Sequence, residues 1–173
     1  MQTGNTPTNQ EIIKSKIYSR ETLARQLNIW RFHDKRIVFT NGCFDLLHLG
    51  HIDYLSKAAD LGNILIVGVN SDASVRRLGK GKTRPIQDEH SRAMLLAALC
   101  FISAVVLFDE DTPYNLIALV QPDVLVKGAD YTPEEIAGHD IVTKKGGRIH
   151  ILDYLSGYST SVIEKKIISG NKG

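Results

Sequence analysis

The sequence is poor in three features, and each shortage excludes a class of protein. Its 173 residues include two cysteines, Cys43 and Cys100, and neither lies in a C-x-x-C pair, so no zinc knuckle or dithiol redox motif is indicated. The formal net charge is +2, which gives no bulk electrostatic attraction for nucleic acid. No apolar run approaches the roughly 20 residues that a membrane-spanning helix needs.

The rest of the composition is that of an ordinary globular protein, with 43% apolar and 23% charged residues. The length suits one domain with a sizeable core. Two isolated cysteines and no signal-peptide pattern predict a reducing, cytoplasmic setting. We therefore expect small molecules as partners, and neither nucleic acid nor a membrane.

The order of apolar segments predicts the fold class. Residues 1–18 begin with the polar stretch MQTGNTPTNQ and are expected to form an N-terminal tail. Residues 19–173 are expected to form a single domain, beginning with a helix that Ser19 caps. Five strands are predicted at residues 36–40, 64–69, 104–108, 123–127 and 148–152. Helices are predicted between and after them, at 49–62, at 88–100 with Asp88 as cap, from Thr112, from Thr132 and from about Ser159.

Apolar strands that alternate with amphipathic helices are typical of a parallel sheet covered on both faces. The predicted fold is α/β, a Rossmann-like doubly wound sheet of five parallel strands with helices on both faces. Ligands of such sheets bind beyond the carboxyl ends of the strands. Three polar or glycine-rich segments follow strands, and we expect them around one crevice: TNGCFD, NSDAS and KGADY.

The segment FTNGCFDLLHLGH, residues 39–51, carries the main chemical signal. A strand, a glycine-containing turn and a helix start present backbone N–H groups to an anion. His48 and His51, at positions i and i+3, share one face of the helix start. Gly42 and Gly50 leave room for close approach of a ligand, so we expect a phosphate chain here.

Other interpretations of the segment carry less weight. The two histidines alone could be a solvated pair on a helix. Asp45, His48 and His51 could be metal ligands, but positions i and i+6 point in directions about 120° apart on a helix. The turn has one glycine and is not a G-x-G-x-x-G fingerprint. GKGKT is not a Walker A loop, because position 76 is arginine where that motif needs glycine.

Two short motifs resemble one enzyme family. GCFDLLHLGH is similar to the H-x-G-H motif of the cytidylyltransferase-like nucleotidyltransferases, and YSTS at 158–161 resembles their second signature, at the start of the last helix. Within the family, VNSDASVRRLGKGKTRPI, FDEDTPYNLIALVQPDVLVKGADY and GYSTSVI resemble adenylyltransferase domains that form ADP-heptose. KGAD replaces the KGGD expected there, and YSTS ends in serine where threonine is usual.

The resemblance implies an activity. The expected reaction transfers an adenylyl group from ATP to a sugar 1-phosphate, D-glycero-D-manno-heptose 1-phosphate, giving an ADP-sugar for cell-surface glycan (lipopolysaccharide) synthesis and pyrophosphate. The alternatives are a glycerol-3-phosphate or phosphoethanolamine cytidylyltransferase, pantetheine-phosphate adenylyltransferase, or a regulatory module that binds nucleotide without turnover. The arginine that glycerol-phosphate enzymes carry before the S-T signature is absent from LDYLSGYSTS, which disfavours the cytidylyl alternatives.

The resemblance also implies roles for individual residues. His48, His51 and Arg92 are expected to be catalytic. Asp72, Lys82 and Arg84 are expected to bind substrate, the last two from a basic loop, RRLGKGKTR, whose alternative is a solvated surface. The residues expected to bind the nucleotide are Asn41, Gly42, Cys43, Phe44, Asp45, Lys127, Asp130, Ser159 and Thr160.

Cofactor and partners follow from the same resemblance. Mg²⁺ is expected to arrive with the triphosphate of ATP, and Asp130 is the one candidate protein ligand for it. ATP and a sugar phosphate are the expected substrates. A homo-oligomer and a separate sugar kinase of the same pathway are both compatible with the sequence.

Overall fold

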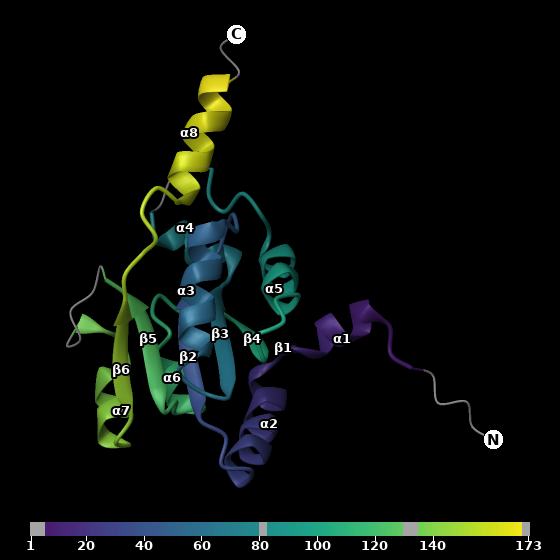
Figure 1. The fold of residues 1–173 in the computed structure, drawn as a ribbon, viewed down its shortest axis with the longest axis vertical. Coiled ribbons are helices and arrows are strands. Elements are labelled where there is room, and N and C mark those ends of the chain that lie inside the picture. Colours follow the sequence, from purple (N-terminus) through teal and green to yellow (C-terminus); the bar gives the residue numbers. More distant parts are fainter. Residues whose placement is uncertain (1–5, 80–82, 130–134, 171–173) are drawn as a thin grey trace.

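The protein, described here from a computed structural model, is built on a sheet of six parallel strands. The structure describes residues 6–79, 83–129 and 135–170 (Figure 1). The strand order is β1-β4-β3-β2-β5-β6, and every pair is parallel. The strands are β1 Ile17–Tyr18, β2 Ile37–Gly42, β3 Ile64–Asn70, β4 Ala104–Phe108, β5 Val124–Gly128 and β6 Arg148–Leu152.

Helices connect and flank these strands: α1 Asn9–Ser15, α2 Arg20–Phe32, α3 Leu49–Ala59, α4 Asp72–Arg77, α5 Glu89–Ala97, α6 Tyr114–Val120, α7 His139–Lys144 and α8 Thr160–Gly170. Ser19 and Asp88 cap α2 and α5 through side-chain hydrogen bonds, as predicted. Thr112 was the wrong cap for α6, because Pro113 occupies the cap position. The helix start predicted at Thr132 lies outside the described residues.

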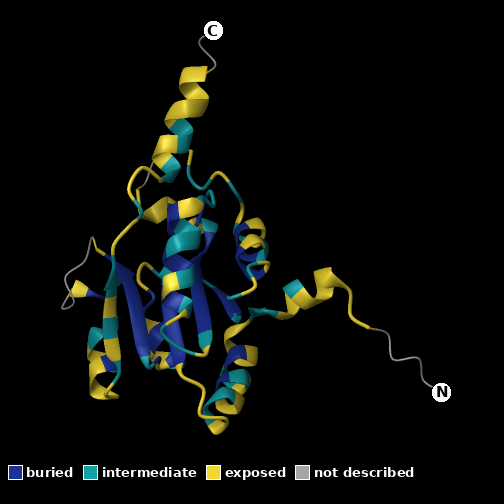
Figure 2. Cartoon of the chain, viewed as in Figure 1, coloured by how far each residue is buried: buried dark blue, intermediate teal, exposed yellow. Residues whose placement is uncertain are grey.

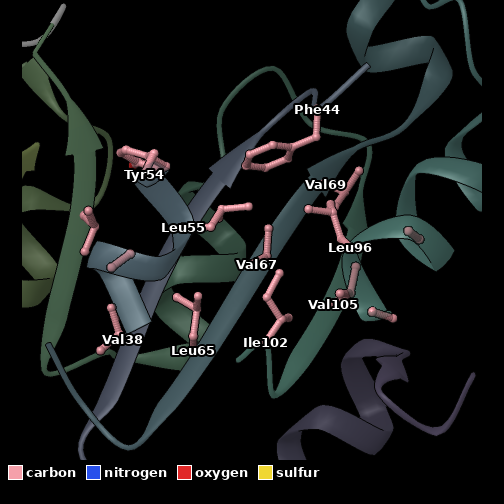
Figure 3. Close-up of a cluster of buried hydrophobic side chains, with 14 of the residues drawn as sticks. Val38, Phe44, Tyr54, Leu55, Leu65, Val67, Val69, Leu96, Ile102 and Val105 are labelled. Carbon is pink, nitrogen blue, oxygen red and sulfur yellow. The ribbon is translucent and has the colours of Figure 1, made fainter. Parts of the chain in front are cut away.

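The helices form one layer on each face of the sheet, which confirms the predicted fold class. Alternate residues of each strand point to opposite faces, and β2 shows this directly. Val38 packs with the α3 and α5 side chains Leu55 and Leu96 in one buried cluster (Figure 3). Phe39 packs in the second cluster with residues of α2, α6 and α7. Figure 2 shows the central strands buried between the two layers.

The strand count differs from the prediction, and so does the N-terminal region. Residues 9–15 form α1, which Thr8 and Glu11 cap reciprocally, and Ile17–Tyr18 pairs with β4. These residues were predicted to belong to a tail. A two-residue strand has no alternation to detect in a sequence, and its pairing depends on the β4 edge being free. The extent of a single domain over residues 19–173 stays a prediction.

The strand order reverses beside β2. From β2 the chain adds β3 and β4 on one side, and then crosses to place β5 against the other side of β2. The connections after β2 and β5 therefore diverge at their carboxyl ends and leave a crevice between them. No helix in the described part of the chain is long and apolar enough to cross a membrane.

Two phenylalanines test this account of the core. Phe39 is 0% exposed and Phe32, at the end of α2, is 83% exposed. Phe39→Ala should lower the free energy of unfolding by about 3–5 kcal/mol, because it removes buried apolar surface and leaves a cavity. Phe32→Ala should change it by less than about 0.5 kcal/mol. Urea denaturation of both variants measures the difference, and equal losses would contradict the assigned core.

Candidate active site

A cleft of about 910 Å³ opens at the carboxyl ends of β2 and β5, at the strand-order reversal. The end of β2 and the turn after it contribute Asn41 through Asp45, together with His48, Gly50 and His51. Lys127 and Gly128 come from β5, and residues 158–161 come from the chain at and just before the start of α8. The cleft therefore brings together segments that are about 30 to 110 residues apart in the chain, as the strand-end rule predicts.

The turn after β2 is built around the Phe44 side chain. Phe44 has a φ of 49°, a left-handed conformation that is a genuine outlier for a bulky residue. Its ring packs edge-on against the His51 ring, with centroids 5.2 Å apart. A Cβ at Gly42 would lie 3.0 Å from this ring, so Gly42 lets the ring pack beneath the turn. Strained backbone of this kind concentrates at functional sites.

His48 and His51 form a stacked pair at the start of α3. Their ring centroids are 3.9 Å apart and the planes differ by 19°, which confirms that they share one face. The Nδ1 atom of each ring is buried without a hydrogen-bond partner among the described residues. Burial lowers the pKa of His51 to about 4, with a further contribution from repulsion by His48, and burial also lowers the pKa of His48. Both imidazoles are therefore neutral at pH 7.

Asp45 lines the cleft and also contacts a second segment of the chain. The carboxylate is buried and accepts hydrogen bonds from the backbone N–H groups of Ile86 and Gln87, at 2.8 and 2.9 Å. Its other oxygen pairs with Arg84 Nη1 at 3.1 Å. Asp45 was expected to bind the nucleotide, which stays a prediction, and its contacts hold the segment at residues 84–87 against the turn.

Arg92 holds the same segment from behind the cleft. Its side chain is 0% exposed and is absent from the cleft lining. It donates to the carbonyl oxygens of Gln87 at 3.0 Å and Cys43 at 2.7 Å, and to Asp72 Oδ1 at 2.8 Å. Arg92 and Asp72, predicted to meet phosphate and substrate, thus form an ion pair in which Arg92 is buried and Asp72 is 23% exposed. The carboxylate and carbonyl partners satisfy the buried guanidinium, and the catalytic role of Arg92 stays a prediction.

Lys127 lies at the bottom of the cleft, where β5 ends. Its side chain is buried, and it donates to Asn41 Oδ1 across the β2–β5 junction. Removal from water lowers the pKa of Lys127 to about 8, because burial disfavours the charged form. Asn41 and Lys127, both predicted to bind nucleotide, are thus side by side in the lining of the cleft.

The start of α8 faces the histidines. Ser159 accepts a hydrogen bond from Val162 N–H at 3.2 Å, so it caps the helix and also lines the cleft with Thr160. A Cβ at Gly50 would lie 3.1 Å from the His48 ring and 3.2 Å from Tyr158 Cβ. Gly50 therefore allows the chain before α8 to approach α3, a use of the motif glycine that the sequence alone does not reveal.

Several lining residues were not singled out from the sequence. Asn70 ends β3 and accepts from Cys43 Sγ at 3.9 Å, and Tyr154 packs so close to Gly128 that no side chain fits there. Asn70 belongs to the strand-end segment NSDAS, so its position was detectable. Tyr154 follows β6 and carries no motif signal. Lys82 and Asp130 lie outside the described residues.

The described residues contain no group of three or more His, Cys, Asp or Glu side chains that could hold a metal ion. The Asp45, His48 and His51 set considered above is therefore not arranged as a metal site. The cleft instead offers stacked neutral imidazoles, a buried lysine, two hydroxyl groups at a helix start and backbone N–H groups. This combination suits a polyanionic ligand such as a triphosphate.

Comparison with protein families agrees with this geometry. The family model described as cytidylyltransferase-like matches residues 39–164, a range that begins in β2 and ends in α8. The chain belongs to the cytidylyltransferase-like family. Both signatures, H-x-G-H and the S-T segment, lie within the matched range, and residues of both line the cleft.

Individual relatives in this family extend the comparison. The chain is 54% identical over 154 residues to the bifunctional protein HldE of Syntrophotalea carbinolica, and 52% identical over 159 residues to that of Campylobacter jejuni. These alignments cover 89% and 92% of this chain, but 31% and 33% of the relatives. The chain thus spans about a third of the length of the curated relatives it matches.

Solved structures confirm the fold of this family member. The lipopolysaccharide core biosynthesis protein of Thermoplasma volcanium is 32% identical, with a TM-score of 0.57, and the match covers 72% of this chain and 99% of that one. Pantoate-beta-alanine ligase of Francisella tularensis is 15% identical, with a TM-score of 0.58 over 86% of this chain and 75% of that one, which shows a shared fold alone.

The buried histidine pair makes stability depend on pH. An unfolded histidine takes up a proton below about pH 6.5, while folded His51 stays neutral down to about pH 4. The free energy of unfolding should therefore fall as pH drops from 6.5 to 4, by at most about 3 kcal/mol for this one group. His51→Gln should reduce the slope, measured by urea denaturation at pH 7 and pH 5. His150→Gln, at an exposed histidine of β6, should leave it unchanged.

Proposed function

We propose that the protein is a nucleotidyltransferase that transfers the adenylyl group of ATP to D-glycero-D-manno-heptose 1-phosphate, releasing pyrophosphate and ADP-heptose. The observation that carries the proposal is that residues of both family signatures line one cleft. The 52–54% identity to bifunctional HldE proteins supports the adenylyl donor and the heptose acceptor over the cytidylyl alternatives.

The reaction needs positioning and charge neutralisation more than covalent chemistry. A phosphate oxygen of the sugar attacks the α-phosphorus, and the bond to the pyrophosphate oxygen breaks in line. His48 and His51 donate hydrogen bonds to the triphosphate, where negative charge accumulates. Each neutral imidazole has one N–H donor, and donors held in place before the reaction stabilise the transition state without reorganisation.

Other residues of the cleft bind the two substrates. Ser159, Thr160 and the α8 N-terminus hold the outer phosphates, and backbone groups at Gly42, Cys43 and Phe44 contact the nucleotide. Lys127, with its pKa near 8, is mostly protonated at pH 7, and the negative charge of a bound polyanion raises this pKa further. The hydrogen bond to Asn41 keeps the ammonium group of Lys127 aimed at the ligand. Arg84 contributes a further cation at the rim of the cleft.

Arg92 and Asp72 act indirectly in this scheme. Their mutual contact and the two carbonyl contacts of Arg92 fix the turn that carries Cys43 and the segment near Gln87. Mg²⁺ is proposed only as the ion that accompanies the triphosphate. No step is assigned to it, since the described residues offer no carboxylate cluster for it.

The cellular setting is part of the same proposal. Cys43 and Cys100 are not joined in a disulfide, which suits a reducing cytoplasm. A sugar 1-phosphate must be supplied by a phosphorylating enzyme, and we propose a sugar kinase for that step. ATP and the sugar phosphate are the proposed partners, with no role for nucleic acid.

A substrate matrix tests the proposed function. ATP, CTP, GTP and UTP are each incubated with heptose 1-phosphate and with glycerol 3-phosphate, and pyrophosphate release is measured. A site built to hydrogen-bond one base rejects another strongly, because unpaired buried polar groups are costly, so ATP with heptose 1-phosphate should exceed other pairs by a large factor. Faster release with CTP or with glycerol 3-phosphate would overturn the assignment, and binding of ATP without release would favour a regulatory module.

The histidine roles give a second test. His51→Ala should lower kcat by about 10²-fold, the usual loss for one positioned donor, while ATP affinity stays within about tenfold. Single-turnover kinetics and calorimetric ATP titration measure the two quantities. His150→Ala, outside the cleft, should retain full turnover. Normal kcat in both His48→Ala and His51→Ala would refute the mechanism.

A further inference from the structure

An ion-pair relay joins three separate elements at the rim of the cleft. The Arg84 side chain is 12% exposed. Its Nη1 donates to Asp45 Oδ2 at 3.1 Å, and its Nη2 donates to Glu164 Oε2 at 2.7 Å. Asp45 belongs to the turn after β2, whereas Glu164 lies in α8. One guanidinium therefore connects the turn that precedes the H-x-G-H motif with α8.

The Asp45 end of this relay is held by several hydrogen bonds. The buried Asp45 carboxylate also accepts from the N–H groups of Ile86 and Gln87, so it contacts both the Arg84 side chain and the backbone beyond it. Arg92 adds a bond to the Gln87 carbonyl oxygen. Asp45 is thus the more strongly supported of the two carboxylate partners of Arg84.

The Glu164 end controls a helix with little other support. α8 projects away from the sheet (Figure 1) and is largely exposed (Figure 2), and its apolar residues Ile167 and Ile168 are 60% and 64% exposed. An 11-residue helix is marginal in water without tertiary contacts. Glu164 lies one helical turn after Thr160, so its contact with Arg84 constrains the turn that carries Ser159 and Thr160.

We propose that Glu164 is a positioning residue: through Arg84 it sets where Ser159 and Thr160 lie relative to His48 and His51. Partly buried, charge-assisted hydrogen bonds are stronger and more directional than exposed ion pairs. Loss of the Glu164 charge frees the first turn of α8, and the hydroxyl groups of that turn no longer stay within reach of the phosphates. The effect on turnover rests on the proposed function, whereas the effect on the helix does not.

The opposite role for the same contact predicts the opposite result. If Glu164 only competed with phosphate for Arg84, its removal would release a cation into the cleft and tighten ATP binding. A positioning role predicts weaker binding and slower turnover, because a displacement of about 1 Å can cost up to about 10²-fold in rate. The sign of the change in KM separates the two.

The test compares Glu164→Gln with Lys165→Gln, a neutralising change at the next residue of α8, which is exposed. Hydrogen exchange of residues 160–168 is measured first, without substrate. Glu164→Gln should accelerate exchange there by about tenfold or more, as expected when a local opening becomes easier, with Tm close to that of the parent protein. Lys165→Gln should exchange like the parent. Unchanged exchange in Glu164→Gln would overturn the proposal even if the protein proved to have another activity.

Kinetics then test the connection with the helix start. Glu164→Gln should raise the KM for ATP and lower kcat/KM by about tenfold. In a protein that already carries Thr160→Ala, Glu164→Gln should have a smaller effect on both quantities, because changes that act through the same residues are not additive. Additive losses, or a lower KM, would overturn the positioning role. If the parent protein releases no pyrophosphate from any nucleotide, the proposed function fails, and the exchange result still decides the role of Glu164.

Discussion

The site depends on the hydrogen bonds that two buried side chains, Asp45 and Arg92, make to the neighbouring loops. Asp45 accepts from two backbone N–H groups at residues 86 and 87 and from Arg84, and Arg92 donates to the carbonyl oxygens of Cys43 and Gln87. Together they fasten the segment before α5 to the turn after β2. A buried charge is tolerated only when it is fully partnered. This pair therefore specifies one arrangement of two loops that would otherwise lie free on the surface, and the cleft takes its shape from that arrangement.

The position of the cleft has an earlier cause in the strand order. β3 and β5 flank β2, so the chain segments that leave β2 and β5 diverge and leave a crevice. Lys127 and Asn41 close its floor, while Phe44 supports the His51 ring from below. Asn41 and Lys127 therefore belong to strands that lie between two hydrophobic clusters, whereas Ser159 and Thr160 belong to the start of the exposed helix α8. Groups held in place before the reaction are what electrostatic stabilisation of a developing charge requires.

Burial and charge act in opposite directions on the groups of the cleft. Desolvation keeps His48 and His51 neutral and lowers the pKa of Lys127 to about 8, so Lys127 is still mostly protonated at pH 7. Arg84, a permanent cation, is balanced by Asp45 and Glu164. A polyanionic substrate would therefore supply the charge that these groups are arranged to meet. The stored backbone strain at Phe44 is consistent with a site held in place before its ligand arrives.

Much of this could be predicted from the sequence because the signals were local. Strand and helix alternation, the caps at Ser19 and Asp88, and the shared face of His48 and His51 all depend on residues within a few positions of one another. Other features depended on contacts between distant segments and were not predicted. These are the additional strand β1, the absence of Arg92 and Asp72 from the cleft lining, and the packing roles of Gly42 and Gly50. The pairing of Arg84 with Glu164 joins residues 80 positions apart. The sequence by itself determined the fold class and the chemical character of the site, because periodicity and motif spacing are written along the chain. Tertiary structure alone decided which charged groups reach the cleft, because burial and partner choice depend on what the fold brings together in space.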